Sequence, residues 1–125
     1  MNTPAELKYT KDHEWVKIEG NVATIGITDF AQGELGDIVF VDVDTVDDDL
    51  SAGDVFGSVE AVKTVSDLFL PIAGKVIEFN GDLEGQPELL NSDPYGNGWI
   101  IKLELAEGAD QGELLSAEEY QATLG

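Results

Sequence analysis

Short runs of strand-forming residues, separated by turns that contain glycine, dominate this sequence. Two such runs, 15–18 and 22–27, are joined at Gly20, a residue that tolerates the positive φ of a tight hairpin turn. Further strand-forming runs cover residues 37–43, 55–70, 75–80 and 99–105. Many short strands with such turns are typical of a β-sandwich or barrel, so we expect a mainly β fold.

The last of these runs shows the clearest alternation of apolar and polar side chains. Its apolar residues at every second position are Trp99, Ile101, Leu103 and Leu105. Charged side chains, Lys102 and Glu104, fall between them. This pattern predicts a half-buried strand with all four apolar residues on one face.

Helices are expected as short additions to the strands. Thr28 is typical of an N-cap and Gly36 of a terminator, which predicts one short helix between them. Residues 81–98 form an irregular connection with room for one or two helical turns. Ser116 and Glu119 have the spacing of a capping box, which predicts a helix at the C-terminus.

The composition narrows the classes of function. The chain has no cysteine and one histidine, which excludes disulfides and metal sites built from thiolates or histidine clusters. Six lysines, no arginine and 26 acidic residues give a net charge of −20, which disfavours nucleic acids and anionic membranes and attracts basic partners. No apolar run approaches the roughly 20 residues that span a bilayer, and the first residues resemble neither a signal nor a transit peptide.

We therefore expect a soluble chain with one domain over residues 1–125. The expected location is the cytoplasm, as in bacteria, or the mitochondrial matrix if a presequence has been removed. The high acidity favours solubility and is compatible with a salty habitat.

Motifs for metal, nucleotide or nucleophilic chemistry are not supported. The acidic run 42–54 has the composition of a calcium loop, but Val46 and Gly53 stand where an EF-hand needs an oxygen ligand and a glutamate. A solvated loop is the better interpretation. His13 has no nucleophile motif beside it, which favours a structural or pocket-lining role.

Lys63 lies between two strand-forming runs, in VEAVKTVSDL, where a hairpin turn is expected. It is either an ordinary solvated lysine or an exposed point of attachment for a prosthetic group, which a modifying enzyme would reach at a protruding turn. A third interpretation, a Schiff-base nucleophile, needs an uncharged amine, whereas Glu60 and Asp67 nearby favour the charged form. The residues alone leave the first two interpretations open.

Six segments, in the same order along the chain, resemble the H proteins of the glycine cleavage system. They are YTKDHEWV (9–16), VATIGITDFAQGELGDIVFVDV (22–43), GSVEAVKTVSD (57–67), PIAGKV (71–76), NSDPYGNGWIIKL (91–103) and LLSAEEY (114–120). The resemblance implies a fold similar to the lipoyl and biotinyl domains, a flattened barrel or barrel-sandwich hybrid of two small antiparallel sheets. It also implies one lipoic acid per chain, attached covalently to Lys63.

The resemblance implies a non-catalytic carrier rather than an enzyme. Lipoyl-Lys63 would carry the aminomethyl group and electrons between glycine decarboxylase (the P protein), aminomethyltransferase (the T protein) and dihydrolipoamide dehydrogenase (the L protein). Lipoylating enzymes would be further partners, and a monomer is expected. A short tether makes each encounter local, with effective concentrations of about millimolar.

In this family the loaded arm folds into a surface cleft. Glu14 and Asp67 match cleft positions at which carboxylates would hold the cationic amine. Glu14 is the stronger candidate, because Asp67 can also serve to cap the hairpin. Asp12 stands where the family can have a small neutral residue, so it adds negative charge near the cleft. Glu60 is a candidate for recognition by the lipoylating enzyme.

Related carriers and other roles are the alternatives. A biotin-carrier lysine usually lies between methionines, whereas Val62 and Thr64 flank Lys63. A lipoyl domain of a 2-oxoacid dehydrogenase would normally belong to a larger chain than these 125 residues. The same residues also permit a lipoyl donor in a relay to other enzymes, or an interaction module with an unmodified lysine.

Overall fold

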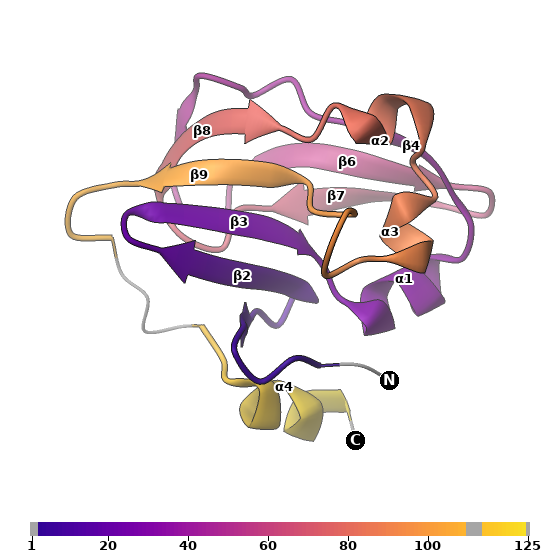
Figure 1. Cartoon of the computed structure of the whole chain (residues 1–125), viewed down its shortest axis with the longest axis horizontal. Helices are drawn as coiled ribbons and strands as arrows, with labels where there is room; N and C mark the ends of the chain where they lie inside the picture. Colours follow the sequence, from indigo (N-terminus) through magenta and orange to yellow (C-terminus); the bar gives the residue numbers. More distant parts are fainter. Residues whose placement is uncertain (1–2, 110–113, 125) are drawn as a thin grey trace.

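The computed structural model describes residues 3–109 and 114–124, and in these ranges two antiparallel sheets pack face to face (Figure 1). In spatial order, the six-stranded sheet contains β1 (Lys8–Tyr9), β2 (Glu14–Glu19), β3 (Val22–Ile27), β9 (Ile101–Leu105), β8 (Gly74–Phe79) and β5 (Asp49–Leu50). The three-stranded sheet contains β4 (Ile38–Asp42), β6 (Val55–Ala61) and β7 (Val65–Phe69). The predicted mainly β architecture is confirmed, as a sandwich rather than a closed barrel.

Apolar side chains from both sheets meet in one core. In β9, Ile101 and Leu103 are fully buried, whereas Lys102 and Glu104, which alternate with them, are partly or fully exposed. In β6, Phe56 is likewise fully buried. Burial of each such side chain is worth about 1.5–3 kcal/mol, so the core holds the two sheets rigidly against each other.

Trp99 departs from the predicted alternation. It lies outside β9, which begins at Ile101, and it packs against a second cluster of buried residues: Leu7, Tyr9, Trp15 and Tyr120. Nζ of Lys102 lies 5.2 Å from the centre of the Trp99 ring, a cation–π distance. The prediction that Trp99 shares the buried face of Ile101 is therefore wrong, because the extended backbone does not continue back to it.

The helices are short, and their ends follow the predicted signals. In α1 (Asp29–Leu35), the Thr28 hydroxyl accepts a hydrogen bond from the Ala31 N–H, and the helix ends at Gly36 with φ +79°. α2 (Asp82–Gly85) and α3 (Leu89–Ser92) occupy the irregular connection. In α4 (Ala117–Leu124), Ser116 and Glu119 exchange the two hydrogen bonds of a capping box.

The hairpin of β6 and β7 extends from one end of the sandwich. Glu60 pairs with Val65, and the Ala61 N–H donates to the Thr64 carbonyl at 2.7 Å. The turn therefore places Lys63 at its tip, at the same end of the molecule as α1, α2 and α3 (Figure 1). Within the described ranges, no helix is long and apolar enough to cross a membrane.

Candidate functional site

Lys63 lies on a turn that is exposed at its tip and anchored at its base. All four residues from Val62 to Val65 are exposed, with Val62 at 76%. The Val62 N–H donates to the Asp37 carbonyl at 3.0 Å, which ties the turn to the segment between α1 and β4. The amine is thus accessible to a modifying enzyme, while the backbone that carries it is fixed to the rigid sheet.

The Lys63 side chain extends toward the end of α1. A Cβ atom added to Gly36 would lie 3.5 Å from Cε of Lys63 and 4.0 Å from its Nζ. Gly36 therefore leaves room for the lysine chain where any other residue would place a side chain in contact with it. Its φ of +79° also favours glycine, so conformation and space require the same residue.

Asn91 holds Gly36 in place from α3. The Asn91 amide donates to the Gly36 carbonyl at 2.8 Å and to Oε1 of Gln32 at 3.1 Å, and its Oδ1 accepts from the Ile38 N–H at 2.9 Å. One side chain thus satisfies backbone groups on both sides of the α1–β4 turn. The surface beneath the Lys63 chain is preorganised by these hydrogen bonds.

Glu14 is a buried carboxyl group that connects the two sheets. It begins β2, opposite Ile27, and only 2% of its surface is exposed. Its Oε2 accepts a hydrogen bond of 2.9 Å from the Phe69 N–H of β7, the edge strand of the other sheet. Among the described residues, its Oε1 is buried without a hydrogen-bond partner.

Burial raises the pKa of Glu14 well above its ordinary value. The Phe69 N–H opposes this shift in pKa by stabilising the carboxylate, and the negative charge of Asp12 reinforces it. A buried polar atom without a partner is uncommon in native proteins and requires a reason. A cationic group that binds Oε1 would stabilise the ionised form and supply the missing hydrogen bond.

Asp67 lies on the same edge strand as the amide that Glu14 binds. Its Cα is two residues from that of Phe69, about 7 Å along the extended strand β7. Asp67 is exposed and pairs with Ser58 across the hairpin. The structure thus places Asp67 and the bond to the Glu14 carboxyl on the same edge strand, β7. Lys63 lies on the turn before this strand, and its side chain extends toward Gly36.

Asp12 and Glu60, the other two acidic residues considered, do not lie on β7. Asp12 is exposed in the turn before β2, where its N–H donates to the Thr10 hydroxyl at 3.2 Å. The same hydroxyl accepts from the Glu14 N–H at 3.2 Å, so Thr10 fixes the backbone beside the buried carboxyl. Glu60 faces outward from β6, opposite Val65 and three residues before Lys63.

His13, for which the sequence favoured a structural or pocket-lining role, lies in the turn just before Glu14, and its partners were not identified from the sequence. His13 has φ +66°, and its Nδ1 lies 2.8 Å from the Tyr120 hydroxyl, which lies 2.8 Å from Oγ1 of Thr28. The His13 ring packs against Phe30 with centroids 4.6 Å apart. Burial lowers the pKa of His13, against the opposing effect of nearby carboxylates. No local pattern connects α4 to this turn, because Tyr120 lies more than a hundred residues away along the chain.

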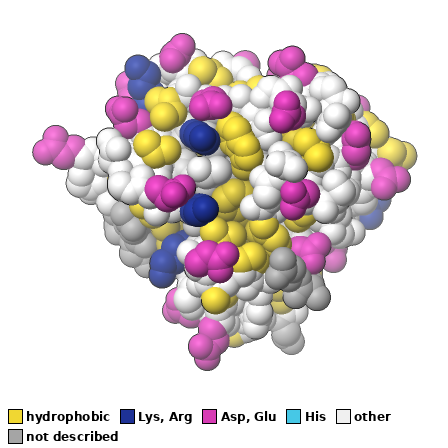
Figure 2. All heavy atoms as spheres, viewed as in Figure 1, with side chains coloured by type: hydrophobic (Ala, Val, Ile, Leu, Met, Phe, Trp, Pro, Cys, Tyr) yellow, Lys and Arg dark blue, Asp and Glu magenta, His cyan; other side chains and the backbone are white. Residues whose placement is uncertain are grey.

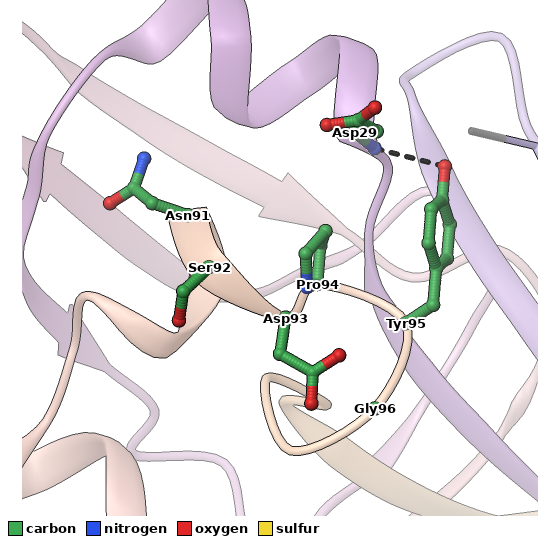
Figure 3. Close-up of a pocket in the computed structure, with 7 residues that line it drawn as sticks. All are labelled: Asp29, Asn91, Ser92, Asp93, Pro94, Tyr95 and Gly96. Atoms are coloured by element: carbon green, nitrogen blue, oxygen red, sulfur yellow. Dashed lines mark hydrogen bonds between the residues drawn. The ribbon is translucent and has the colours of Figure 1, made fainter. Parts of the chain in front are cut away.

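Two hollows lie near these elements, and Lys63, Glu14 and Asp67 line neither of them. One, of about 390 Å³, lies between the start of α1 and residues 91–96 (Figure 3). At its edge the Tyr95 hydroxyl accepts a hydrogen bond of 2.9 Å from the Asp29 N–H, and burial raises the pKa of Tyr95 to about 12. The other, of about 500 Å³, is lined by Thr10, Lys11, Asp12, Ala52, Gly53, Leu70, Pro71, Leu114 and Leu115.

The arrangement of possible metal ligands decides whether the described part of the chain can hold an ion. Within residues 3–109 and 114–124, no three side chains of histidine, cysteine, aspartate or glutamate are placed to hold an ion together. The acidic run 42–54 contains the short strand β5, and its carboxylates between Asp42 and Asp49 are exposed. This agrees with the interpretation of the run as a solvated connection.

Three comparisons with known proteins, by family model, by sequence and by structure, agree with one another on the family of this chain. The family model described as "Glycine cleavage H-protein" matches residues 7–125. The glycine cleavage system H protein of Staphylococcus saprophyticus is 57% identical in an alignment that covers 100% of this chain and 99% of that protein. The glycine cleavage system H protein of Bacteroides fragilis is 58% identical in an alignment that covers 99% of this chain and 98% of that protein. A crystal structure of a glycine cleavage system H protein from Mycobacterium marinum superposes with a TM-score of 0.89 at 40% identity and covers 98% of both chains. The chain therefore belongs to the glycine cleavage H-protein family.

Proposed function

We propose that this chain is a non-catalytic carrier, one lipoyl domain over residues 1–125, that bears a single lipoic acid on Lys63. The observation that carries the proposal is the position of Lys63 at the exposed tip of an anchored hairpin, in a chain of this family. The residues present fit such a group, because Nζ is accessible and Gly36 leaves the space beside it open. Glu60 is proposed as the carboxylate that the lipoylating enzyme recognises.

When bound, the lipoyl group supplies a cyclic disulfide that takes up an aminomethyl group and electrons. The contribution of the chain is to present one attachment atom, Nζ of Lys63, to each partner in turn. The proposed partners are glycine decarboxylase, aminomethyltransferase and dihydrolipoamide dehydrogenase. A monomer in the cytoplasm suits this role, and the relatives compared above are bacterial.

We further propose that Glu14 and Asp67 hold the cationic amine of the loaded arm. The Phe69 N–H occupies Oε2 of Glu14, which leaves Oε1 to accept from the amine. A cation beside Glu14 favours its charged form and so opposes the rise in pKa that burial causes. Asp67 adds a second carboxylate at the exposed edge, and the charge of Asp12 reinforces the attraction.

The attachment site is tested by intact mass measurement and peptide mapping of protein isolated from lipoate-replete native cells. Lipoate is expected on the peptide that contains Lys63 and on no other lysine. The variant Lys63→Arg keeps the positive charge and should carry no lipoate and support no glycine cleavage. Complete absence of lipoate from the wild-type peptide would overturn the carrier proposal.

The role of Glu14 is tested by the rate at which the loaded arm releases ammonia and formaldehyde in water. A hydrogen bond to a charged group is worth about 1.5–3 kcal/mol, so Glu14→Ala should accelerate the loss roughly 10- to 100-fold. Glu14→Gln keeps the volume and an acceptor for the Phe69 N–H but lacks the charge, and it should also accelerate the loss. The matched control is Glu19→Ala, at the exposed end of the same strand. An unchanged rate in both Glu14 variants would remove Glu14 from this role.

A further inference from the structure

The outer face of the three-stranded sheet leads directly to Lys63. The strand register places Phe40, Glu60 and Val65 side by side across β4, β6 and β7. It places Asp42, Ser58 and Asp67 in the adjacent row. Residues paired across neighbouring strands share a face, so both rows belong to one continuous surface next to the hairpin tip.

This face exposes apolar side chains that the fold does not use. The exposed fractions are 53% for Phe40, 62% for Val65 and 76% for Val62 at the tip. In their row, Phe40 and Val65 lie on either side of Glu60, and Val62 lies at the tip beyond that row. The face therefore presents exposed apolar and acidic side chains next to one another. A partner that covers these side chains removes apolar surface from water, which stabilises the complex.

The charged side chains of β4, β6 and β7 on this face are all negative. Asp42, Glu60 and Asp67 are all exposed, and β4, β6 and β7 contain no lysine. In the six-stranded sheet, by contrast, Lys17, Lys75 and Lys102 lie on β2, β8 and β9. Figure 2, which looks onto that other sheet, shows lysine side chains in the middle of its outer face. The cations are thus separated from the face that adjoins Lys63.

We propose that this face, formed by Phe40, Asp42, Glu60, Val65 and Asp67, is the docking surface for the enzymes that act on the Lys63 arm. The partner it fits is a protein surface that offers apolar side chains to Phe40 and Val65 and a lysine or arginine to Glu60 between them. Further basic side chains of the partner would face Asp42 and Asp67 in the adjacent row. This inference rests on the proposed function and adds the surface by which the partners recognise the chain.

The size of the face fits a transient complex. Three strands spaced about 4.8 Å apart and some 17 Å long present roughly 250 Å² in projection. Stable complexes bury about 800 Å² on each partner, so this face alone supports a weak contact. A carrier that must leave one enzyme for the next requires rapid dissociation, and the partners' opposite charges compensate by raising the rate of association.

The test measures KM and kcat for the chain as substrate of two enzymes: the lipoylating enzyme, with the unmodified chain, and glycine decarboxylase, with the lipoylated chain. Phe40→Ser is expected to raise KM at least about 5-fold with both enzymes and to leave kcat within about 2-fold, since it removes binding and not chemistry. The matched control is Ile77→Ser on β8, an exposed apolar residue of the other sheet, which should leave KM unchanged. Equal KM values for the two variants would overturn the docking surface.

The electrostatic part is tested with a charge-matched pair of double variants. Asp42→Asn with Glu60→Gln, assayed on chains that mass measurement shows to carry lipoate, should weaken the dependence of kcat/KM on salt concentration for glycine decarboxylase. Glu19→Gln with Glu104→Gln changes the net charge equally on the other sheet and should leave that dependence as in the wild type. The same salt dependence in both double variants would refute the electrostatic part of the docking surface. Failure of wild-type Lys63 to accept lipoate would instead refute the proposed function, so the two failures are distinguishable.

Discussion

The Tyr120 hydroxyl is the point at which the C-terminal helix is joined to the turn before Glu14. It lies 2.8 Å from Nδ1 of His13 and 2.8 Å from Oγ1 of Thr28. The Tyr120 hydroxyl has one proton to donate and can also accept, so it can bond to both partners at once. Tyr120→Phe removes both hydrogen bonds and keeps the ring.

The expected loss of stability follows from these contacts. Each hydrogen bond contributes about 1 kcal/mol, and the Thr28 hydroxyl, which is fully buried, loses Tyr120 as a partner. The stacking of the ring on Tyr9, with centroids 4.9 Å apart, remains. The free energy of unfolding should therefore fall by roughly 2 kcal/mol, and Tm by roughly 8 °C for a chain of this size.

Urea denaturation measures this change as a lower midpoint with an unchanged m value. Tyr120→Leu provides the comparison, because it also removes the stacked ring and should cost more than Tyr120→Phe. A loss below about 0.5 kcal/mol in Tyr120→Phe, the size of an ordinary surface substitution, would refute the hydrogen-bonded chain as a stabilising element.

Two further predictions concern β2 and its neighbour. Because the pKa of Glu14 is raised in the folded state, the unfolded chain loses this proton first as pH rises. The free energy of unfolding of the wild type, measured relative to that of Glu14→Gln, should thus fall as pH rises from about 4.5 to the raised pKa, by at most about 1.4 kcal/mol per pH unit. If urea titrations show the same pH dependence of this free energy for both proteins, the prediction is wrong. Gly26→Ala would place a Cβ 2.6 Å from Nε1 of Trp15. The substitution should lower the free energy of unfolding by about 1–3 kcal/mol. It should also shift the tryptophan fluorescence, because the hydrogen bond from Nε1 of Trp15 to the Pro94 carbonyl breaks. An unchanged fluorescence spectrum and an unchanged urea midpoint would exclude the clash.

The features that the sequence predicted are those with local causes. The Lys63 hairpin follows from strand-forming residues on both sides of a short turn, and the ends of α1 follow from Thr28 and Gly36. The capping box of α4 depends on two side chains three residues apart. In each case a few neighbouring residues determine the conformation, so a pattern in one segment is sufficient.

The environment of Glu14 depends on contacts between distant segments. Glu14, Trp15 and Val16 are buried in succession, which breaks the alternation of a strand with one wet face. The reason is that β2 is covered on both faces, by the core on one side and by the cluster around Tyr9 and Tyr120 on the other. The resemblance indicated Glu14, whereas its bond to Phe69 and its free Oε1 require the assembled sandwich.

The pairing of Tyr9 with Leu115 has a consequence for the order of folding. Each backbone N–H of this pair donates to the other carbonyl, at 2.8 and 2.7 Å, so the bridge joins segments from opposite ends of the chain. A contact this distant in sequence forms only after the intervening chain has become compact, since loop closure costs entropy that local pairs do not incur. Docking of α4 should be the last step of folding, and in native-state hydrogen exchange its amides should open before those of β6 and β9.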